Sequence, residues 1–342
     1  MSLVSLRSLY TQWFPPAPTF TEQQVPSQSG RVFIVTGGNA GIGFELCKIL
    51  YGTGATIYMA ARSKARAEEA IKNITASTSP APENPGTLKF LHLDLNDLTS
   101  VRAAATAFAS QESKLDVLWN NAGPGANTVP AGSRTAQGLE PMIGTHCVAT
   151  LLFTTLLLPQ LRAASAPEAG LSAGHTRVVW TSSFLAEGSS PTNGIELPLL
   201  KDGTADRVRN YAVAKAGTWM LGREFGARYG DREGIVSVVQ NPGNVVAGSY
   251  GGSPALVMLV TKPLLHETRY GAYTELFAGL APEVAEGENG CYVIPWGRIR
   301  TDEECPRKDI IKAMAAEEDG GLGYGGKLWA WCEQQWLRSS GP

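Results

Sequence analysis

Two side chains spaced one helical turn apart could together transfer a proton. Tyr211 and Lys215 are separated by three residues, in a pattern that predicts a helix running to Tyr229, so the phenol and the ammonium share one face. A tyrosine with its ordinary pKa of roughly 10 exchanges protons poorly at neutral pH. A neighbouring cation favours the phenolate and lowers that pKa towards the working range. Taken alone, the spacing is common, and a surface pair is its usual explanation.

A glycine-rich turn near the start of the chain could hold a pyrophosphate. The apolar run Val32–Val35 leads into Thr36–Gly43, which is rich in glycine, and a helical pattern then continues through Leu50. Glycine permits backbone dihedrals closed to other residues and lets a ligand approach, while the free N–H groups of a helix N-terminus attract anions. The segment therefore predicts a dinucleotide cradle. A glycine-rich turn without a ligand is the alternative.

The end of the second predicted strand bears on which dinucleotide would bind. After residues 55–60 the chain continues Ala61-Arg62-Ser63-Lys64. No acidic residue stands where one usually holds the ribose hydroxyls of NAD. Arg62 is well placed to bind the extra phosphate of NADP. We therefore expect NADP(H), with a solvated arginine at a strand end as the alternative.

The elements that must position these residues alternate between strands and helices. Uniformly apolar strands, separated by intervals of helix length, predict a parallel sheet covered on both faces. The predicted strands are residues 32–35, 55–60, 88–93, 116–119, 177–181, 235–239 and 291–294. Helices are expected near 63–75 and after a cap at Asn96 or Thr99. The fold class is α/β, a single doubly wound Rossmann domain with a seven-stranded parallel sheet in the order 3-2-1-4-5-6-7.

The chain divides into a central domain with an appendage at each end. We expect an N-terminal extension over residues 1–30, the Rossmann domain over 31–300 and a C-terminal helical tail over 301–342. Apolar residues at helical spacing in the extension predict a helix that packs on its own domain, and contact with a membrane or a partner is the alternative. Tryptophans in the tail predict a second docked helix. The apolar residues are Leu3, Leu6, Leu9, Trp13 and Phe14, and the tryptophans are Trp329, Trp331 and Trp336.

Composition excludes several classes of partner. The 29 basic and 31 acidic residues nearly balance and form no block of like charge, so we expect a small-molecule ligand, no nucleic acid and no strong membrane signal. Five scattered cysteines indicate neither a disulfide framework nor a metal site, and a cytoplasmic location is expected. The most apolar stretch, 147–158, is too short to span a bilayer and predicts a buried helix.

Six motifs in series resemble the short-chain dehydrogenase/reductase family. The resemblance covers about residues 31–300 and is closest to the retinol-dehydrogenase-like and light-induced fungal branch, because of the long interval between Ser183 and Tyr211 and the segment 292–298. The motifs are Thr36-Gly37 with Gly41 and Gly43, Leu93-Asp94-Leu95, Asn120-Asn121-Ala122-Gly123, Ser182-Ser183, Tyr211 with Lys215, and Asn241-Pro242-Gly243.

The resemblance implies a role for each matching residue. Ser183 would hydrogen-bond the substrate carbonyl, Tyr211 would give or take the proton, and Lys215 would hold the nicotinamide ribose. Asn39 would lie near the adenosine ribose, and Asn120 would brace the adenosine side or serve the sheet instead. The remaining cofactor contacts that it implies are Gly37, Gly41, Ile42, Gly43, Asp94, Leu95, Asn121, Ala122, Gly123, Pro242, Gly243 and Val245.

Two positions depart from the family pattern. His146 stands where the family has a catalytic asparagine, in a distorted helix whose backbone carbonyl holds a relay water. The histidine either preserves that relay, perturbs it, or is a core residue bonded to the backbone. The family's threonine after Pro-Gly is also missing, since the segment from Asn244 has no hydroxyl until Ser249. The nicotinamide could therefore be held more loosely than usual.

We therefore expect an NADPH-dependent carbonyl reductase or alcohol dehydrogenase that needs no metal and acts as a monomer or homodimer. Its substrate pocket should be built by residues 184–210 and 247–266, where Phe184, Leu185 and Tyr250 indicate an apolar, fairly bulky compound. Two alternatives stay open. One is a redox-neutral isomerase or cyclase, which His146 allows, and the other is a non-catalytic NADPH-binding protein.

Overall fold

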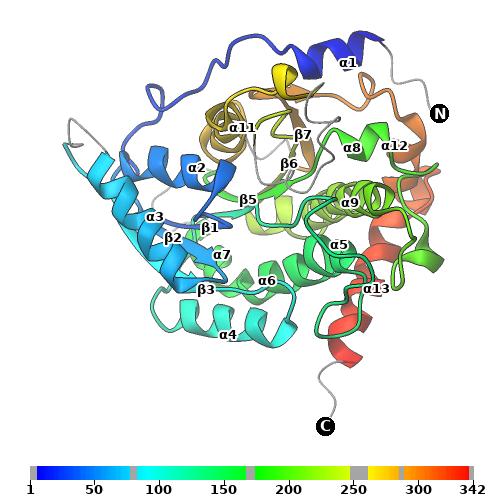
Figure 1. The fold of residues 1–342 in the computed structure, drawn as a ribbon, viewed down its shortest axis with the longest axis horizontal. Helices are drawn as coiled ribbons and strands as arrows, with labels where there is room; N and C mark the ends of the chain where they lie inside the picture. The colour runs from blue at the N-terminus through cyan, green and yellow to red at the C-terminus, as the bar shows by residue number, and fades with distance from the viewer. Residues whose placement is uncertain (1–5, 78–82, 167–173, 247–260, 285–288, 339–342) are drawn as a thin grey trace.

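A central sheet organises the molecule (Figure 1). This computed structural model describes residues 6–77, 83–166, 174–246, 261–284 and 289–338. Among them the sheet has eight strands in the order β3-β2-β1-β4-β5-β6-β7-β8, and β1 to β7 are parallel. The strands are β1 Val32–Thr36, β2 Thr56–Ala61, β3 Thr87–His92, β4 Val117–Asn120, β5 Thr176–Thr181, β6 Ile235–Gln240, β7 Cys291–Ile294 and β8 Arg298–Arg300. The predicted α/β class and the order of seven parallel strands are confirmed.

Strand β8 corrects the prediction of a seven-stranded sheet. It runs antiparallel to β7, with Ile294 opposite Arg298 and Tyr292 opposite Arg300. The chain reverses at Gly297, whose φ of +85° suits glycine. β8 has only three residues, two of them arginine, so its composition carries no strand signal.

Helices cover both faces of the sheet. One face lies under α2, α3 and α11, and the other under α4, α6, α9 and α13. The described helices are α1 Leu6–Trp13, α2 Gly41–Tyr51, α3 Lys64–Ser77, α4 Leu98–Ala109, α5 Pro141–Ile143, the π-helix η1 Gly144–Ala149, α6 Thr150–Leu156, α7 Leu158–Ser165, α8 Leu185–Gly188, α9 Arg207–Glu233, α11 Thr268–Leu280, α12 Lys308–Met314 and α13 Tyr324–Arg338.

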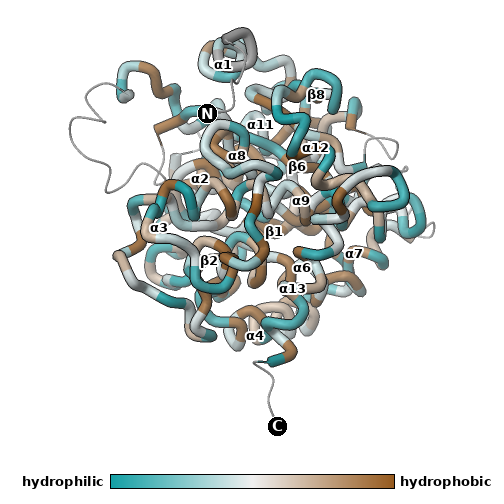
Figure 2. The backbone as a smooth tube through the Cα atoms, turned by 90° about the vertical axis from the view of Figure 1, so that its right-hand side faces the viewer, coloured by the Kyte–Doolittle hydropathy of each residue, from teal (hydrophilic) through white to brown (hydrophobic). Residues whose placement is uncertain are grey.

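Successive side chains of a strand enter two separate hydrophobic clusters. In β1, Ile34 belongs to the cluster under α9, whereas Phe33 and Val35 belong to the cluster under α2 and α11. Both faces are therefore buried, which explains why the strands are apolar throughout. Figure 2, coloured by the hydropathy of each residue, shows hydrophobic residues around β1 and β6 and many hydrophilic residues in the outer loops.

The cap of α4 differs from the prediction. Asp97, rather than Asn96 or Thr99, precedes the first helical residue in an extended conformation, and its carboxylate accepts the N–H of Thr99 at 2.9 Å. Asn96 lies one residue too early, in a turn where its N–H is taken by Asp94 at 3.0 Å. Thr99 lies inside the first turn, where its N–H needs an acceptor.

The apolar stretch 147–158 forms buried helix, as predicted, in η1, α6 and the start of α7. In the part of the chain that the structure describes, no single helix is long and apolar enough to cross a membrane. Only the bent pair Pro141–Leu156 and Leu158–Ser165, which meet at 55°, passes that test jointly.

Both ends of the chain pack onto the domain. Trp329 and Trp336 of α13 are buried, so the predicted docking of the tail is confirmed. Figures 1 and 2 both place α1 at the rim, above α8 and α11. Gln12 of α1 is only 1% exposed, so the described part of the extension packs on its own domain. Phe14 is 50% exposed, and the side chains of Leu3, Leu6 and Leu9 lie outside the described residues.

Candidate active site

Tyr211 and Lys215 lie one turn apart near the start of α9. Asp206 begins this helix by accepting the N–H groups of Val208 and Arg209 at 2.9 and 3.1 Å, which places the pair in its first turns. The Lys215 ammonium lies 5.5 Å from the centre of the Tyr211 ring. Tyr211 is half-buried, whereas Lys215 is buried. A cation is therefore held beside a partly accessible phenol.

Lys215 is fixed from below by the end of strand β5. Its ammonium donates a 2.7 Å hydrogen bond to the backbone carbonyl of Thr181. The Thr181 hydroxyl in turn donates to the carboxylate of Glu275 in α11 at 2.8 Å and accepts from Gln240 at 2.9 Å. Thr181, Gln240 and Glu275 were not predicted, because they come from three elements far apart in sequence and carry no local motif.

This buried arrangement perturbs both charged groups. Burial lowers the pKa of Lys215 to about 8, although nearby Glu275 favours the charged lysine. Burial also raises the pKa of Glu275 to about 7, against the effects of the Thr181 hydrogen bond and of Lys215. Desolvation penalises each charged form, and each group partly offsets the penalty of the other. Lys215 therefore changes charge within a working pH range.

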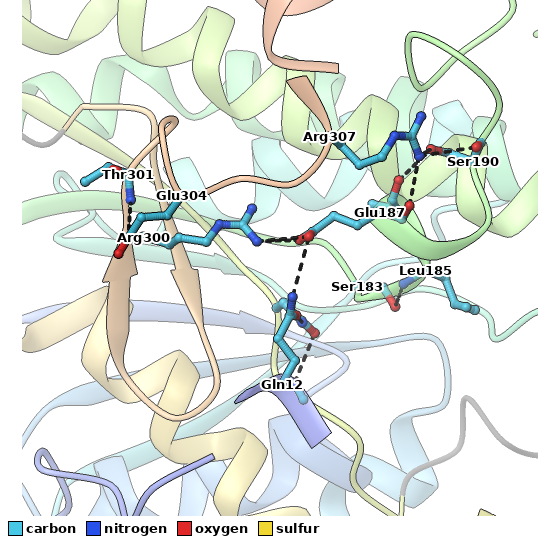
Figure 3. Close-up of polar contacts among 12 residues, drawn as sticks. Gln12, Ser183, Leu185, Glu187, Ser190, Arg300, Thr301, Glu304 and Arg307 are labelled. Atoms are coloured by element: carbon cyan, nitrogen blue, oxygen red, sulfur yellow. Dashed lines mark hydrogen bonds and ion pairs between the residues drawn. The ribbon is translucent and has the colours of Figure 1, made fainter. Parts of the chain in front are cut away.

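Ser183 lies in the short connection between β5 and α8. Its hydroxyl oxygen accepts the N–H of Leu185 at 3.2 Å, which leaves the O–H available as a donor (Figure 3). The neighbouring Ser182 is buried and donates to the carbonyl of Lys215 at 2.9 Å. Ser182 therefore ties β5 to α9, whereas Ser183 is half-buried and the better candidate to meet a ligand.

His146 lies in the π-helical turn η1, a local distortion of the helix that follows β4. Its Nε2 is 3.0 Å from the carbonyl of Pro124, and its ring meets the Tyr211 ring edge-on at 5.7 Å. Burial and the charge of Lys215 lower its pKa well below the ordinary value. The imidazole is therefore neutral, and because a carbonyl only accepts, Nε2 carries the proton. The backbone carbonyl of His146 accepts from Thr218 at 3.3 Å.

The glycine-rich turn after β1 is shaped for a diphosphate. Gly37 and Gly41 have φ of +69° and +57°, a region open mainly to glycine. A Cβ at Gly43 would lie 2.6 Å from the carbonyl of Gly37, so the turn is too tight for a larger residue there. Helix α2 begins after Ala40, which makes no side-chain cap. Its first N–H groups, including those of Gly41 and Ile42, are thus available to phosphate oxygens.

The loop after β4 braces this turn. Asn121 donates to the carbonyl of Thr36 at 2.7 Å, and the Thr36 hydroxyl accepts the N–H of Ala122 at 2.9 Å. Asn120 is buried and donates to Thr154 of α6 at 2.9 Å, so its side chain serves the sheet and helix. Gly123 lies directly against the ring of His146, since a Cβ there would be 1.9 Å from Cε1.

The residues predicted to face the adenosine lie after the carboxyl ends of β1, β2 and β3. Arg62 is exposed immediately after β2, and Asn39 is half-buried in the glycine-rich turn. Asp94 is half-buried after β3 and orders its own turn by accepting the N–H of Asn96. Leu95 is buried. These positions fit the ribose and adenine end of a dinucleotide.

The turn after β6 completes the other end of the candidate cofactor site. Asn241 accepts the N–H of Gly243 at 3.1 Å, and Gly243 has a φ of +83°. Pro242 is buried beside them, and Val245 is buried with a bridge to His266. The turn follows β6, in which Gln240 lies opposite Thr181 of β5. It therefore lies at the same carboxyl end of the sheet as Lys215, which is bonded to Thr181.

The predicted substrate residues are only partly described. Phe184 and Leu185 are half-buried, and the Phe184 ring meets Trp13 of α1 edge-on at 6.4 Å. Tyr250 and the segment 247–260 lie outside the described residues. The contributions of Trp13 and Gln12 were not anticipated, because the extension predicted only a packing helix. Among the described residues, no group of three or more His, Cys, Asp or Glu side chains could hold a metal ion.

Comparison with known proteins is consistent across sequence and structure. A family profile described as short chain dehydrogenase matches residues 31–193. The chain is 48% identical to the short-chain dehydrogenase/reductase iacJ of Pestalotiopsis fici, over 98% of this chain and 99% of that protein. It is 38% identical to the short-chain dehydrogenase/reductase bet4 of Neocamarosporium betae, over 96% and 93% of the two chains.

Solved structures share the fold. An uncharacterized protein from Mycobacterium paratuberculosis has a TM-score of 0.64 at 25% identity, covering 92% of this chain and 97% of that one. The NADPH-bound carbonyl reductase from chicken fatty liver has a TM-score of 0.57 at 23% identity, covering 81% and 100%. The second likeness shows a common architecture and no more.

Proposed function

The chain belongs to the short-chain dehydrogenase/reductase family, and from this premise we propose that it is an NADP(H)-dependent oxidoreductase. It reduces a ketone or aldehyde of an apolar, fairly bulky small molecule, or oxidises the corresponding alcohol. The observation that supports this most is the Lys215 ammonium, buried and lying 5.5 Å from the centre of the Tyr211 ring. A fixed cation beside a phenol is what proton transfer by tyrosine requires.

The residues divide the chemistry among them. When bound, NADPH supplies the hydride that the carbonyl carbon accepts. Ser183 donates a hydrogen bond to the carbonyl oxygen and stabilises the negative charge that develops there. Tyr211 donates its proton to that oxygen, and the Lys215 ammonium stabilises the phenolate that remains. The neutral His146 holds the backbone of the π-helical turn against the Pro124 loop. Oxidation of an alcohol runs through the same groups in reverse.

The preference for NADP over NAD is carried by Arg62. Its guanidinium is exposed at the end of β2, next to the glycine-rich turn, where a 2′-phosphate can be gripped by two N–H groups. The solved carbonyl reductase with the same fold binds NADPH, which agrees with this choice.

The proposed substrate is apolar because the walls near Ser183 are apolar. Phe184 and Leu185 follow the serine, and Trp13 packs on Phe184. None of the five cysteines forms a disulfide, and four of them are buried, which suits a reducing compartment, so we place the enzyme in the cytoplasm.

A redox-neutral isomerase or cyclase is the second candidate, and the observation in its favour is an imidazole edge-on to Tyr211. The two functions differ in whether the cofactor is consumed. A panel of apolar ketones and aldehydes, followed at the nicotinamide absorbance, decides between them. One NADPH oxidised per alcohol formed supports the reductase. Product formed from a bound substrate without NADPH oxidation would replace it with the isomerase.

A further inference from the structure

The N-terminal helix α1 brings a buried polar side chain to the candidate active site. Tyr10 and Phe14 of this helix are 65% and 50% exposed, whereas Gln12 between them is 1% exposed. A glutamine side chain is normally solvated, so its burial here calls for polar partners. Gln12 has polar partners in both neighbouring segments of the candidate site: Asn241 in the turn after β6, and Glu187 in α8, which follows Ser183.

On one side Gln12 holds the turn that borders the nicotinamide position. Its Oε1 accepts a 2.7 Å hydrogen bond from Nδ2 of Asn241. The other end of the Asn241 amide accepts the N–H of Gly243, so both polar atoms of this side chain are used. Gln12 thereby fixes the side chain around which the Asn241–Gly243 turn is folded.

On the other side Gln12 reaches α8, the helix that begins two residues after Ser183. Its Nε2 lies 3.5 Å from Oε2 of Glu187 in α8 (Figure 3). Glu187 is fully buried and accepts from Nη1 of Arg300 at 2.9 Å through both oxygens. Arg307 donates to the backbone carbonyl of Glu187 at 2.8 Å. The short helix α8, and with it the N–H that orients the Ser183 hydroxyl, is thus held from strand β8 and from Arg307.

Further contacts seat α1 at this position. Arg298 donates to the carbonyl of Thr11 at 2.8 Å, and His266 lies 3.0 Å from the carbonyl of Trp13 through Nε2. The Trp13 ring meets Phe184, the residue after Ser183. Hydrogen bonds to the backbone carbonyls of α1 therefore fix the helix in place, and the Gln12 side chain points between α8 and the turn after β6.

We propose that Gln12 is a positioning residue of the active site, which couples helix α8, just after Ser183, to the turn bordering the nicotinamide. The N-terminal helix is then a working part of the site and not merely a packed appendage. The inference rests on the proposed function for the roles of the two loops, whereas the coupling between them rests on the contacts alone.

Two variants of the full chain separate the two contacts. Gln12→Leu removes both hydrogen bonds at similar size. Gln12→Glu keeps an acceptor for Asn241 but replaces the donor to Glu187 with a second carboxylate, which repels it. Tyr10→Ala is the matched control, because it alters an exposed side chain of the same helix. Amide hydrogen exchange of the ligand-free protein reads the two loops separately, in peptides covering 184–190 and 241–246.

The expected pattern is specific to each variant. Gln12→Leu exchanges about five-fold faster in both peptides, as the loss of one hydrogen bond predicts. Gln12→Glu does so mainly in 184–190, and Tyr10→Ala in neither. Unchanged exchange in Gln12→Leu, or equal changes in Tyr10→Ala, overturns the coupling.

Turnover tests the positioning itself. With any carbonyl compound that the wild type reduces, Gln12→Leu should lower kcat about ten-fold while KM for NADPH stays within about two-fold, and its thermal unfolding should remain cooperative. An unchanged kcat contradicts a positioning role. A wild type that does not bind NADPH by fluorescence titration contradicts the proposed function instead, and the exchange pattern then still decides the coupling.

Discussion

Lys215 and Glu275 are joined through a single residue of the sheet, Thr181. The lysine donates to the Thr181 carbonyl, and the Thr181 hydroxyl donates to the glutamate. Both charged groups are buried, one on the α9 side of β5 and the other on the α11 side. Thr181 therefore links a charged group on the α9 side of the sheet to one on the α11 side, next to the candidate catalytic Tyr211.

Replacing Glu275 should change the pH dependence of activity. Lys215 is charged below its pKa of about 8 and neutral above it. Glu275 is ionised above its pKa of about 7 and then favours the charged lysine. Cys147 and His146, which also lie near Lys215, stay neutral, because burial raises the pKa of Cys147 to about 12 and lowers that of His146. Glu275→Gln keeps an acceptor for Thr181 but removes the charge, so the Lys215 pKa falls.

The alkaline limb of kcat/KM should consequently move to lower pH by roughly 0.5–1 unit. Profiles between pH 6 and 9.5 measure the shift. Glu112→Gln is the control, because that carboxylate pairs with Lys89 and Tyr58 at the other edge of the sheet. An alkaline limb that coincides with the wild type would show that Glu275 does not influence Lys215.

Tyr211→Phe should abolish proton donation while leaving the cofactor site intact. We expect turnover to fall roughly 100- to 10,000-fold, the usual contribution of a positioned acid, with NADPH affinity close to that of the wild type. Tyr229→Phe, in the same helix but packed against Trp329, should retain turnover. Stopped-flow or steady-state NADPH oxidation provides the measurement, and near-normal turnover of Tyr211→Phe would remove this residue from its role.

Arg62→Ala should narrow the preference for NADPH over NADH. Loss of charged hydrogen bonds to a phosphate costs about 1.5–3 kcal/mol, so the ratio of the two affinities should fall roughly 10- to 100-fold. NADH affinity should hardly change, because NADH lacks that phosphate. Arg66→Ala, exposed one turn further on, serves as the control in calorimetric titrations. Equal losses for both cofactors would contradict the assignment.

Gly123→Ala should be destabilising because of His146. The added Cβ would lie 1.9 Å from the imidazole Cε1, and such overpacking typically costs about 1–3 kcal/mol. The double variant Gly123→Ala/His146→Asn should recover most of this loss, since asparagine is smaller. Gly52→Ala, with only an ordinary contact at 3.4 Å, is the control. Urea unfolding midpoints measure each effect, and additive effects of the two substitutions would show that the pair is not in contact.

Much of the fold could be predicted because buried parallel strands have a recognisable, almost uniformly apolar sequence. Val32–Thr36 and Ile235–Gln240 are mostly apolar and buried on both faces, and each predicted strand lies within about one residue of the observed one. Strand β8 was not predicted because its formation depends on pairing with β7 and not on its own composition. The Asp97 cap escaped because three neighbouring polar residues compete and only the backbone conformation selects one.

The site was predictable where chemistry is local in sequence. Tyr211 and Lys215 share one helix, and the glycine-rich turn is one continuous segment. Glu275, Gln240 and Gln12 reach the same region from separate elements, and their residue types are ordinary surface types until the sheet order brings them together. No spacing rule connects Gln12 with Asn241, so only the folded chain shows that contact.

The Gln12–Asn241 hydrogen bond spans 229 residues, and the Gln12–Glu187 contact spans 175. During synthesis α1 leaves the ribosome before either partner exists, and Arg300 emerges later still. The glycine-rich turn can form early, whereas the contacts of Gln12 with Glu187 and Asn241 can both form only after residue 241 has been released. Under the proposed role of Gln12, the enzyme therefore becomes competent for turnover only after strand β6 has left the ribosome.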